Sequence, residues 1–428
     1  MDPLDALLAL EHLGIKFGLE NIRALCGALG SPQLRYRSLI VAGTNGKGSV
    51  TAMVDRALSA AGHRSGRYTS PHLIRLEERI AVDGVPVATG TLRRIAREVL
   101  LVRDRLRDDG VLATDPTFFE VCTAVAFRVF EEAGIDVAVL EVGMGGRFDA
   151  TNAAEPLAGA ITTIDLDHER FLGRTIREIA FEKAGVIKTG MIVVTGESKP
   201  DALDVISSRC REQGARLVLP GEGVTAALSI SDGRTRLEVR TPVRSYPPML
   251  LALRGRHQAG NALVAIRLLE ALEALGIAMP PPAIAAGLTT VRWPGRLDLV
   301  QLRGDRSVLL DAAHNPAGAR VLAEYLEEAY PQRLPIVFGA MRDKDAAAML
   351  ATLAPRASRF VFTRPPNARA AAPAALARLA ASSALSVPVD LAPDPADALA
   401  KAFESGPLVV VAGSLFLVGD LLARLPSA

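Results

Sequence analysis

Residues 38–49 read SLIVAGTNGKGS, and this stretch decides the fold. The run Ser38 to Ala42 predicts a buried strand, and residues 49–61 have the apolar spacing of a helix. A glycine-rich turn between a strand and a helix lets backbone N–H groups approach a phosphate, and a lysine adds a compact cation. The stretch therefore predicts a phosphate-binding loop over Gly43 to Ser49.

This loop departs from the common pattern GxxxxGK[ST]. Val41 stands where the first glycine would be, and Gly48 separates Lys47 from Ser49. The hydroxyl of Ser49 could cap the helix or approach a metal ion. The alternative is a glycine-rich helix cap that contains a lysine by chance, so the loop needs support from the rest of the chain.

Short apolar runs alternate with helical patterns along most of the chain. Near-continuous Val, Ile and Leu runs between helices are typical of parallel strands covered on both faces. The predicted strands are residues 38–42, 63–69, 136–140, 159–164, 191–194, 308–310, 335–338, 359–362 and 408–411. The fold class is therefore α/β and doubly wound.

The chain is long enough for more than one domain, with 428 residues. The segment TTVRWPGRLD, residues 289–298, contains the only tryptophan and a Pro-Gly pair, after which a new strand–helix alternation begins. We expect an N-terminal ATP- and substrate-binding domain over 1–291, a hinge over 292–297, and a smaller Rossmann-like α/β domain over 298–428. Residues 364–394 are low in complexity, and we assign them to the second domain.

Composition excludes several classes of protein. The net charge of +2 gives no field for non-specific nucleic-acid binding, and no apolar run reaches the length of a bilayer span. The three cysteines are scattered, which argues against a thiolate metal site. The first ten residues, MDPLDALLAL, lack the basic start of a signal peptide. We expect a cytoplasmic monomer that acts on small molecules.

Polar residues follow three predicted strands at the edge where α/β proteins bind ligands. Glu141 follows residues 136–140, the cluster Asp165, Asp167 and His168 follows 159–164, and Ser70 follows 63–69. Carboxylate and hydroxyl oxygens suit Mg²⁺ bound beside a nucleotide. Taken singly, a solvated strand-end glutamate or a structural histidine is the commoner case, so the grouping carries the prediction. Lys183 by itself would be a surface lysine on a helix.

A family resemblance joins these motifs. VAGTNGKGS, YTSPHL, LEVGMGGRFDATN, DLDH, EKAG, HQAGNA, WPGR, LDAAHNP and VAGSLF occur in this order along nearly the whole chain. The set resembles the dihydrofolate synthase/folylpolyglutamate synthase family of the Mur ligase superfamily. The resemblance implies an ATP-dependent ligase that activates a carboxylate of dihydropteroate or a reduced folate as an acyl phosphate. L-Glutamate then forms the amide.

The resemblance also implies a role for individual residues. The ATP site would comprise Asn45, Gly46, Lys47, Gly48, Ser49, Asn261, Arg296 and Asp311. Two magnesium ions would be held by Ser70, Glu141, His168 and Lys183, with Lys183 carbamylated by CO₂. The pterin site would comprise Thr117, Phe118, Phe119, Glu120, Phe148, Asp149 and Ala150. His314 and Ser414 would contact glutamate, and Lys47, Lys183, Asp311 and His314 would be the catalytic residues.

Two departures from the family pattern leave the preferred acceptor open. Residues 16–22 (KFGLENI) match the family's GLxRV stretch only loosely, and Phe148 stands where leucine is common. Three other functions fit the motifs less well. A Mur-type peptidoglycan ligase is disfavoured by TSPHL and DATN, and a plain P-loop ATPase or a non-catalytic nucleotide-binding module by the joint presence of Lys47, Glu141, His168, Lys183 and Asp311.

Overall fold

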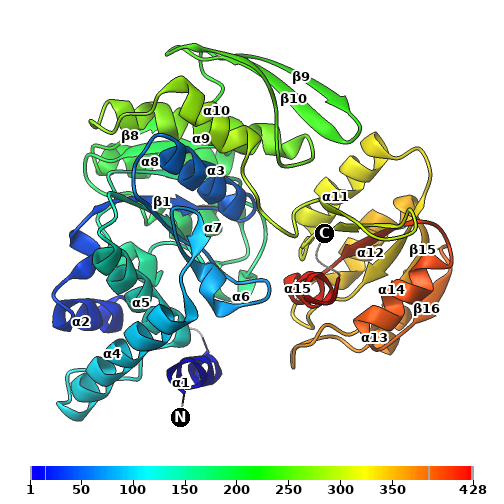
Figure 1. Ribbon diagram of the computed structural model, residues 1–428, viewed down its shortest axis with the longest axis horizontal. Coiled ribbons are helices and arrows are strands. Elements are labelled where there is room, and N and C mark those ends of the chain that lie inside the picture. Colours follow the sequence, from blue (N-terminus) through cyan, green and yellow to red (C-terminus); the bar gives the residue numbers. More distant parts are fainter. Residues whose placement is uncertain (1, 15, 384–385, 426–428) are drawn as a thin grey trace.

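The computed structural model describes residues 2–14, 16–383 and 386–425. Two α/β lobes lie side by side, each built around its own sheet (Figure 1). The N-terminal lobe holds an eight-stranded sheet and a three-stranded sheet, and the C-terminal lobe holds a six-stranded sheet. The α/β class expected from the sequence is confirmed.

The eight-stranded sheet is mostly parallel and has the order β4-β3-β2-β5-β1-β6-β7-β8. Only the pairs β2–β3 and β3–β4 are antiparallel. Strands β2 to β5 lie on one side of β1 and strands β6 to β8 on the other, so the strand order reverses at β1. Ligands of such folds bind at this reversal, beyond the carboxyl ends of the strands. The strands are β1 Arg37–Ala42, β2 Ser65–Tyr68, β3 Ile80–Val82, β4 Val85–Pro86, β5 Val137–Glu141, β6 Ala158–Ile161, β7 Ile192–Thr195 and β8 Arg216–Val218.

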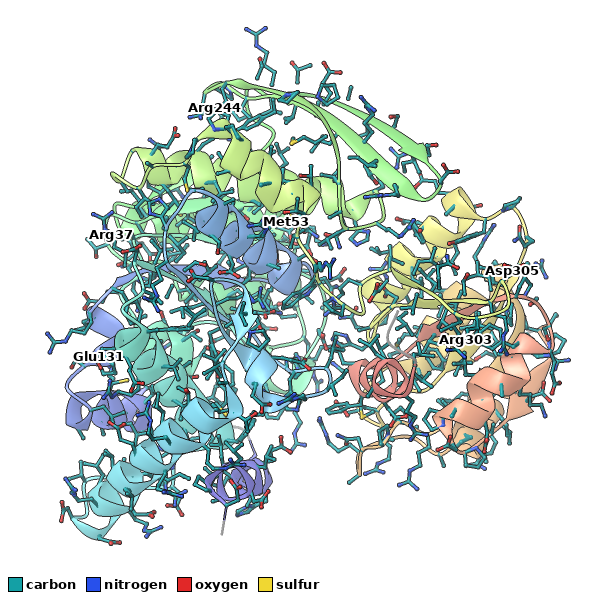
Figure 2. The ribbon with its side chains drawn as sticks, viewed as in Figure 1. Arg37, Met53, Glu131, Arg244, Arg303 and Asp305 are labelled. Atoms are coloured by element: carbon teal, nitrogen blue, oxygen red, sulfur yellow. The ribbon has the colours of Figure 1, made fainter. Side chains whose placement is uncertain are left out.

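Helices cover both faces of this sheet. One face packs against α3, α9 and α10, and fully buried Met53 of α3 marks this layer in Figure 2. The helices of this lobe are α1 Pro3–Ala9, α2 Glu20–Ala28, α3 Lys47–Ala60, α4 Thr89–Asp108, α5 Phe118–Ala133, α6 Glu169–Leu172, α7 Ile176–Ala184, α8 Pro200–Glu212, α9 His257–Glu273 and α10 Pro281–Thr289. Short 3₁₀ helices span Leu10–Leu13, Pro32–Leu34, Leu76–Arg79 and Ala150–Ala153.

The three-stranded antiparallel sheet was not predicted. It comprises β9 Thr225–Ser231, β10 Arg234–Arg240 and β11 Ser245–Leu250 and lies at the top of Figure 1, beyond α9 and α10. Strand β10 alternates buried and exposed residues, so Leu237 and Val239 join the core while Arg236, Glu238 and Arg240 face outward. This is the half-buried pattern of an antiparallel sheet, and a search for continuous apolar runs misses it.

The C-terminal sheet has the order β12-β13-β17-β14-β15-β16, and only β12–β13 is antiparallel. Its strands are β12 Asp298–Gln301, β13 Ser307–Leu310, β14 Leu334–Phe338, β15 Ala357–Phe362, β16 Val389–Leu391 and β17 Leu408–Ala412. Its helices are α11 Pro316–Ala329, α12 Ala346–Leu353, the 3₁₀ turn Ala354–Arg356, α13 Pro373–Ser382, α14 Pro395–Phe403 and α15 Leu415–Arg424. Residues 364–383 and 386–394 therefore belong to this lobe, while 384–385 lie outside the described residues.

One local expectation is wrong. Helix α3 begins at Lys47, two residues earlier than the pattern suggested, and its N-cap is Gly46 rather than Ser49. Gly46 has φ 89°, a left-handed conformation that favours glycine. Elsewhere, no helix in the described part of the chain is both long and apolar enough to cross a bilayer.

Candidate active site between the two lobes

A cavity of about 280 Å³ lies where the carboxyl ends of β1, β5 and β6 face the C-terminal lobe. The register of the sheet places Val41 beside Glu141 and Ala42 beside Ile161, so the segments after these strands meet at one edge. The lining includes the loop from Gly43 to Ser49 together with residues 311, 313–314 and 413–416 of the C-terminal lobe. Both lobes therefore contribute to one site.

The phosphate loop has the geometry that anion binding requires. At the start of α3 the N–H groups of Lys47, Gly48 and Ser49 have no partner within the helix, and all three residues line the cavity. Lys47 Nζ donates to the carbonyls of Gly43 and Thr44, each at 3.1 Å. Burial lowers the pKa of Lys47, with Glu141 and Asp167 opposing that shift. A nucleotide phosphate would supply the anionic partner for this cation.

Helix α9 supplies polar groups beside the loop. Asn261 is buried, lines the cavity and donates through Nδ2 to Gln258 Oε1 at 2.9 Å. Gln258 in turn donates to Ser49 Oγ at 3.3 Å. A Cβ atom on Gly46 would lie 2.6 Å from Asn261 Oδ1, so only glycine allows this close approach. The Ser49 hydroxyl is therefore bound to α9, consistent with assigning the magnesium hydroxyl to Ser70.

The expected metal ligands Ser70, Glu141 and His168 all line the cavity. Glu141 is buried at the end of β5 and accepts a hydrogen bond from Ser70 N at 3.2 Å, and burial raises its pKa. His168 has φ 52°, and burial lowers its pKa to about 4, so its imidazole is neutral and able to bind a metal at neutral pH.

This donor set fits Mg²⁺ as a site completed by the substrate. Within the described residues, no group of three or more His, Cys, Asp or Glu side chains is arranged to hold a metal ion. Mg²⁺ usually binds one or two carboxylates and takes its other ligands from water and substrate phosphates. One carboxylate, one hydroxyl and one imidazole beside a phosphate loop agree with this coordination preference.

Lys183, at the end of α7, is a buried lysine rather than a surface one. Its Nζ donates to Gly43 O at 2.7 Å, and its side chain lines the cavity. Within the described residues no carboxylate lies within 4.0 Å of Nζ. Burial, reinforced by the charge of Lys47, lowers the pKa of Lys183 to about 7.

The C-terminal lobe closes the cavity with Arg296, Asp311, His314 and Ser414. The buried Asp311 carboxylate accepts hydrogen bonds from Leu297 N and Ala313 N, each at 2.9 Å, so it fixes the chain just after Arg296. Burial lowers the pKa of His314 to about 4, and its Nδ1 lies 2.9 Å from Ala312 O. Ser414 caps α15 through a bond from Phe416 N.

The residues expected at the pterin site lie behind the cavity wall. Glu120 Oε2 accepts hydrogen bonds from Thr117 N and Oγ1, which makes a capping box at the start of α5. Asp149 accepts from Met144 N at 2.9 Å and so holds the glycine loop 143–146. Phe118 and Ala150 are buried in the core, Phe119 packs against Gly143, and Arg147 stacks on Phe148 at 4.5 Å. None of these seven residues lines the cavity. Their role in binding the pterin therefore stays a prediction.

Sequence reasoning missed a polar contact between the lobes. Lys344 Nζ donates to Asp167 Oδ1 at 2.6 Å, and both side chains are largely buried. Asn315 Nδ2 donates to Asp167 Oδ2 at 3.0 Å and to Asn45 Oδ1 at 3.2 Å. A weak signal was available, because Lys344 lies in the loop between β14 and α12, on the carboxyl side of a strand of the second lobe.

Comparison with known proteins assigns both lobes to one family. The Mur ligase middle domain matches residues 90–269, and the Mur ligase glutamate ligase domain matches residues 295–415. The chain is 36% identical over 424 residues to the dihydrofolate synthase/folylpolyglutamate synthase of Bacillus subtilis, which covers 96% of each protein.

Solved structures agree with this assignment. The Mycobacterium tuberculosis folylpolyglutamate synthase complexed with ADP and AMPPCP superposes with a TM-score of 0.92 at 34% identity, over 100% of both chains. A bifunctional folylpolyglutamate synthase/dihydrofolate synthase with Mn, AMPPNP and L-glutamate bound gives a TM-score of 0.84 at 30% identity, over 99% of this chain and 98% of that one.

Proposed function

This chain belongs to the dihydrofolate synthase/folylpolyglutamate synthases of the Mur ligase family, and we propose that its reaction takes place in the cavity between the lobes. The enzyme uses ATP to ligate L-glutamate to pteroate or folate acceptors. The observation that carries the proposed site is the meeting of Lys47, Glu141, His168 and Lys183 with His314 and Ser414 around one cavity.

The first step activates the acceptor. A carboxylate oxygen of the acceptor attacks the γ-phosphorus of ATP, and the bond from that phosphorus to the β,γ-bridging oxygen breaks. ADP is released, and the acceptor becomes an acyl phosphate. Phosphoryl transfer between anions depends mainly on positioning and on charge stabilisation. Lys47 and the N–H groups at the start of α3 hold the phosphates from one side, and Arg296 supplies positive charge from the other. Ser70, Glu141 and His168 would hold Mg²⁺, which neutralises phosphate charge when bound.

The second step forms the amide. The amine of L-glutamate attacks the acyl carbon, and inorganic phosphate leaves. The amine must be neutral to attack, and the proton that the attacking nitrogen loses can leave on the inorganic phosphate. His314, whose Nε2 lies 3.9 Å from Asp167 Oδ2, is kept neutral by burial and so places no positive charge against the amine. Ser414 and Lys344 line the same wall and offer a hydroxyl and an ammonium group to the glutamate carboxylates.

We propose further that Lys183 is carbamylated. A neutral amine reacts with CO₂, and the product is an anion. The Lys183 side chain is buried, donates to the carbonyl of Gly43 and lies in the same cavity as Glu141 and His168. A carbamate there would add the second carboxylate-like group that the donor set lacks, which supports binding of a second magnesium ion.

Ligation is expected with dihydropteroate, with tetrahydrofolate or with both when purified enzyme is given ATP, Mg²⁺ and L-glutamate. Phosphate release should require both glutamate and the acceptor, because the acyl phosphate is protected from water between the lobes. The measurement is product mass together with phosphate release for each acceptor offered separately. Phosphate release that is independent of both substrates would indicate a plain ATPase, and ligation only to a UDP-sugar peptide would indicate a peptidoglycan ligase.

Replacing Lys344 with methionine is expected to weaken the contact between the lobes and to slow ligation. The change leaves the carboxylate of Asp167 buried without its cation, and breaking a buried pair in this way costs about 3–5 kcal/mol. If catalysis needs the closed arrangement, kcat/KM should fall by roughly 100-fold or more, since about 1.4 kcal/mol corresponds to a factor of ten. Steady-state kinetics and the radius of gyration in solution measure the two effects.

A matched control is available at the same interface. Arg320 Nη2 and Asp165 Oδ2 also bridge the lobes, at 3.1 Å, but the Arg320 side chain is 53% exposed. Exposed pairs contribute about 1 kcal/mol or less, so Arg320→Met should change kcat/KM by no more than about fivefold. Equal effects of the two substitutions would contradict a special role for the buried pair.

A further inference from the structure

Trp293, the only tryptophan in the sequence, lies against the phosphate loop. A Cβ atom placed on Gly48 would lie 2.9 Å from both Cζ2 and Nε1 of the indole, too close for any side chain. The common phosphate-loop pattern has serine or threonine directly after the lysine. In this chain Gly48 occupies that position, and its lack of a side chain leaves room for the indole.

Arg67 also contacts the indole. The guanidinium carbon of Arg67 lies 5.1 Å from the ring centroid, within the range of a cation–π contact. Arg67 Nη1 also donates to Asp55 Oδ2 at 3.0 Å, and Asp55 is fully buried on α3. The indole is therefore fixed to α3 directly at Gly48, where the helix begins, and indirectly at Asp55.

Immediately after Trp293 the chain is attached to the other lobe. Ala312 N donates to Gly295 O, and Leu297 N donates to Asp311 Oδ2, each at 2.9 Å. Only Pro294 separates the residue packed on the phosphate loop from the first residue bonded to the C-terminal lobe. Pro294 has a restricted φ, Gly295 is held by its bond to Ala312, and Arg296 follows directly and lines the cavity.

We propose that Trp293 is a positioning residue that couples the phosphate loop to Arg296 and to the C-terminal lobe. A nucleotide bound at Gly46 to Ser49 fixes the surface that the indole contacts. Because Arg296 lies only three residues after Trp293, the position of the indole then determines where Arg296 lies in the cavity. The proposal rests on the proposed function, because it assumes that both lobes act on one nucleotide. It also accounts for the glycine that separates Lys47 from Ser49.

The coupling is tested by comparing ADP affinity with turnover in four variants. In Trp293→Ala the phosphate loop itself is unchanged, so the Kd for ADP should stay within about threefold while kcat falls about tenfold or more, in the range of typical coupling effects. Trp293→Phe, which keeps a flat ring, should recover most of kcat. Gly48→Ala should lower kcat as Trp293→Ala does because its methyl group displaces the indole, and its Kd for ADP should rise as well because Gly48 is part of the phosphate loop. The control is Gly27→Ala on α2, where an added Cβ meets nothing within 4 Å.

Intrinsic fluorescence separates this proposal from the assignment of the reaction. Saturating ADP should change the Trp293 emission of the wild type and of Gly27→Ala, and this change should be reduced in Gly48→Ala, whether or not ligation is observed. Unchanged wild-type emission, or wild-type kcat in Trp293→Ala, would overturn the proposal. Loss of ADP binding together with a lower Tm in both Trp293→Ala and Trp293→Phe would also overturn it, because that pattern marks a purely structural role.

Discussion

Replacing Lys47 with alanine is expected to abolish ligation while the protein remains folded. The ammonium group is the cation at the centre of the phosphate loop, and among the described residues its hydrogen bonds go to the carbonyls of Gly43 and Thr44. Removing one preorganised charge-stabilising group typically costs about 100- to 1000-fold in kcat, and here ATP binding weakens as well. Product formation by mass spectrometry and the Kd for ADP measure the two losses.

The fold should tolerate this change because the ammonium is partly buried and its desolvation is unfavourable, as the lowered pKa of Lys47 reflects. The Tm of Lys47→Ala should therefore equal or slightly exceed that of the wild type. Lys401→Ala is the matched control, since Lys401 pairs with Asp390 on the C-terminal lobe and lies outside the cavity. Normal turnover in Lys47→Ala would exclude the loop as the ATP site.

The sequence was sufficient for the central strands of both α/β sheets and for most of the cavity, because both follow from local rules. The strands at the sheet edges, β3, β4, β8, β12 and β16, were not predicted. Runs of three to seven residues located the strands that end near the cavity, which are β1, β2, β5, β6, β13, β14 and β17. The rule that ligands bind beyond the carboxyl ends of strands then selected Glu141, His168 and the loop after β1. These residues lie together because parallel strands all end at the same edge of a sheet.

Other features depend on contacts between distant segments, and no local pattern contains them. Gly48 and Trp293 touch although 245 positions separate them, and Asp167 meets Lys344 only because the lobes face each other. The short left-handed turn at His168 is likewise set by its surroundings. The residues predicted to bind the pterin were chosen from a family motif. In the structure, Thr117 and Glu120 hydrogen-bond each other at the start of α5, and Asp149 holds the loop at Met144. Both that site and the hinge at 292–297 stay predictions.

Replacing Lys183 with alanine is expected to lower kcat at least about 100-fold, an effect comparable to removing a metal-binding carboxylate. Short carboxylates such as acetate or formate should then restore part of the activity. The substitution empties a buried space next to the carbonyl of Gly43, and a small anion fits there beside Ser70, Glu141 and His168. If Lys183 acts as a carbamate, the missing component is an anion, and an exogenous anion can replace it.

The charge of the additive that restores activity distinguishes Lys47 from Lys183. Lys47 acts as a cation in this account, so the same carboxylates should leave Lys47→Ala inactive, and an alkylamine is the only kind of additive that could help it. Lys183→Ala should show the opposite preference, with recovery by carboxylates and none by amines. Recovery of Lys183→Ala by an amine would mean that its charge in the working enzyme is positive. An unmodified Lys183 in the density of a crystal grown with bicarbonate would contradict carbamylation, and the second magnesium ion would then lack its proposed ligand.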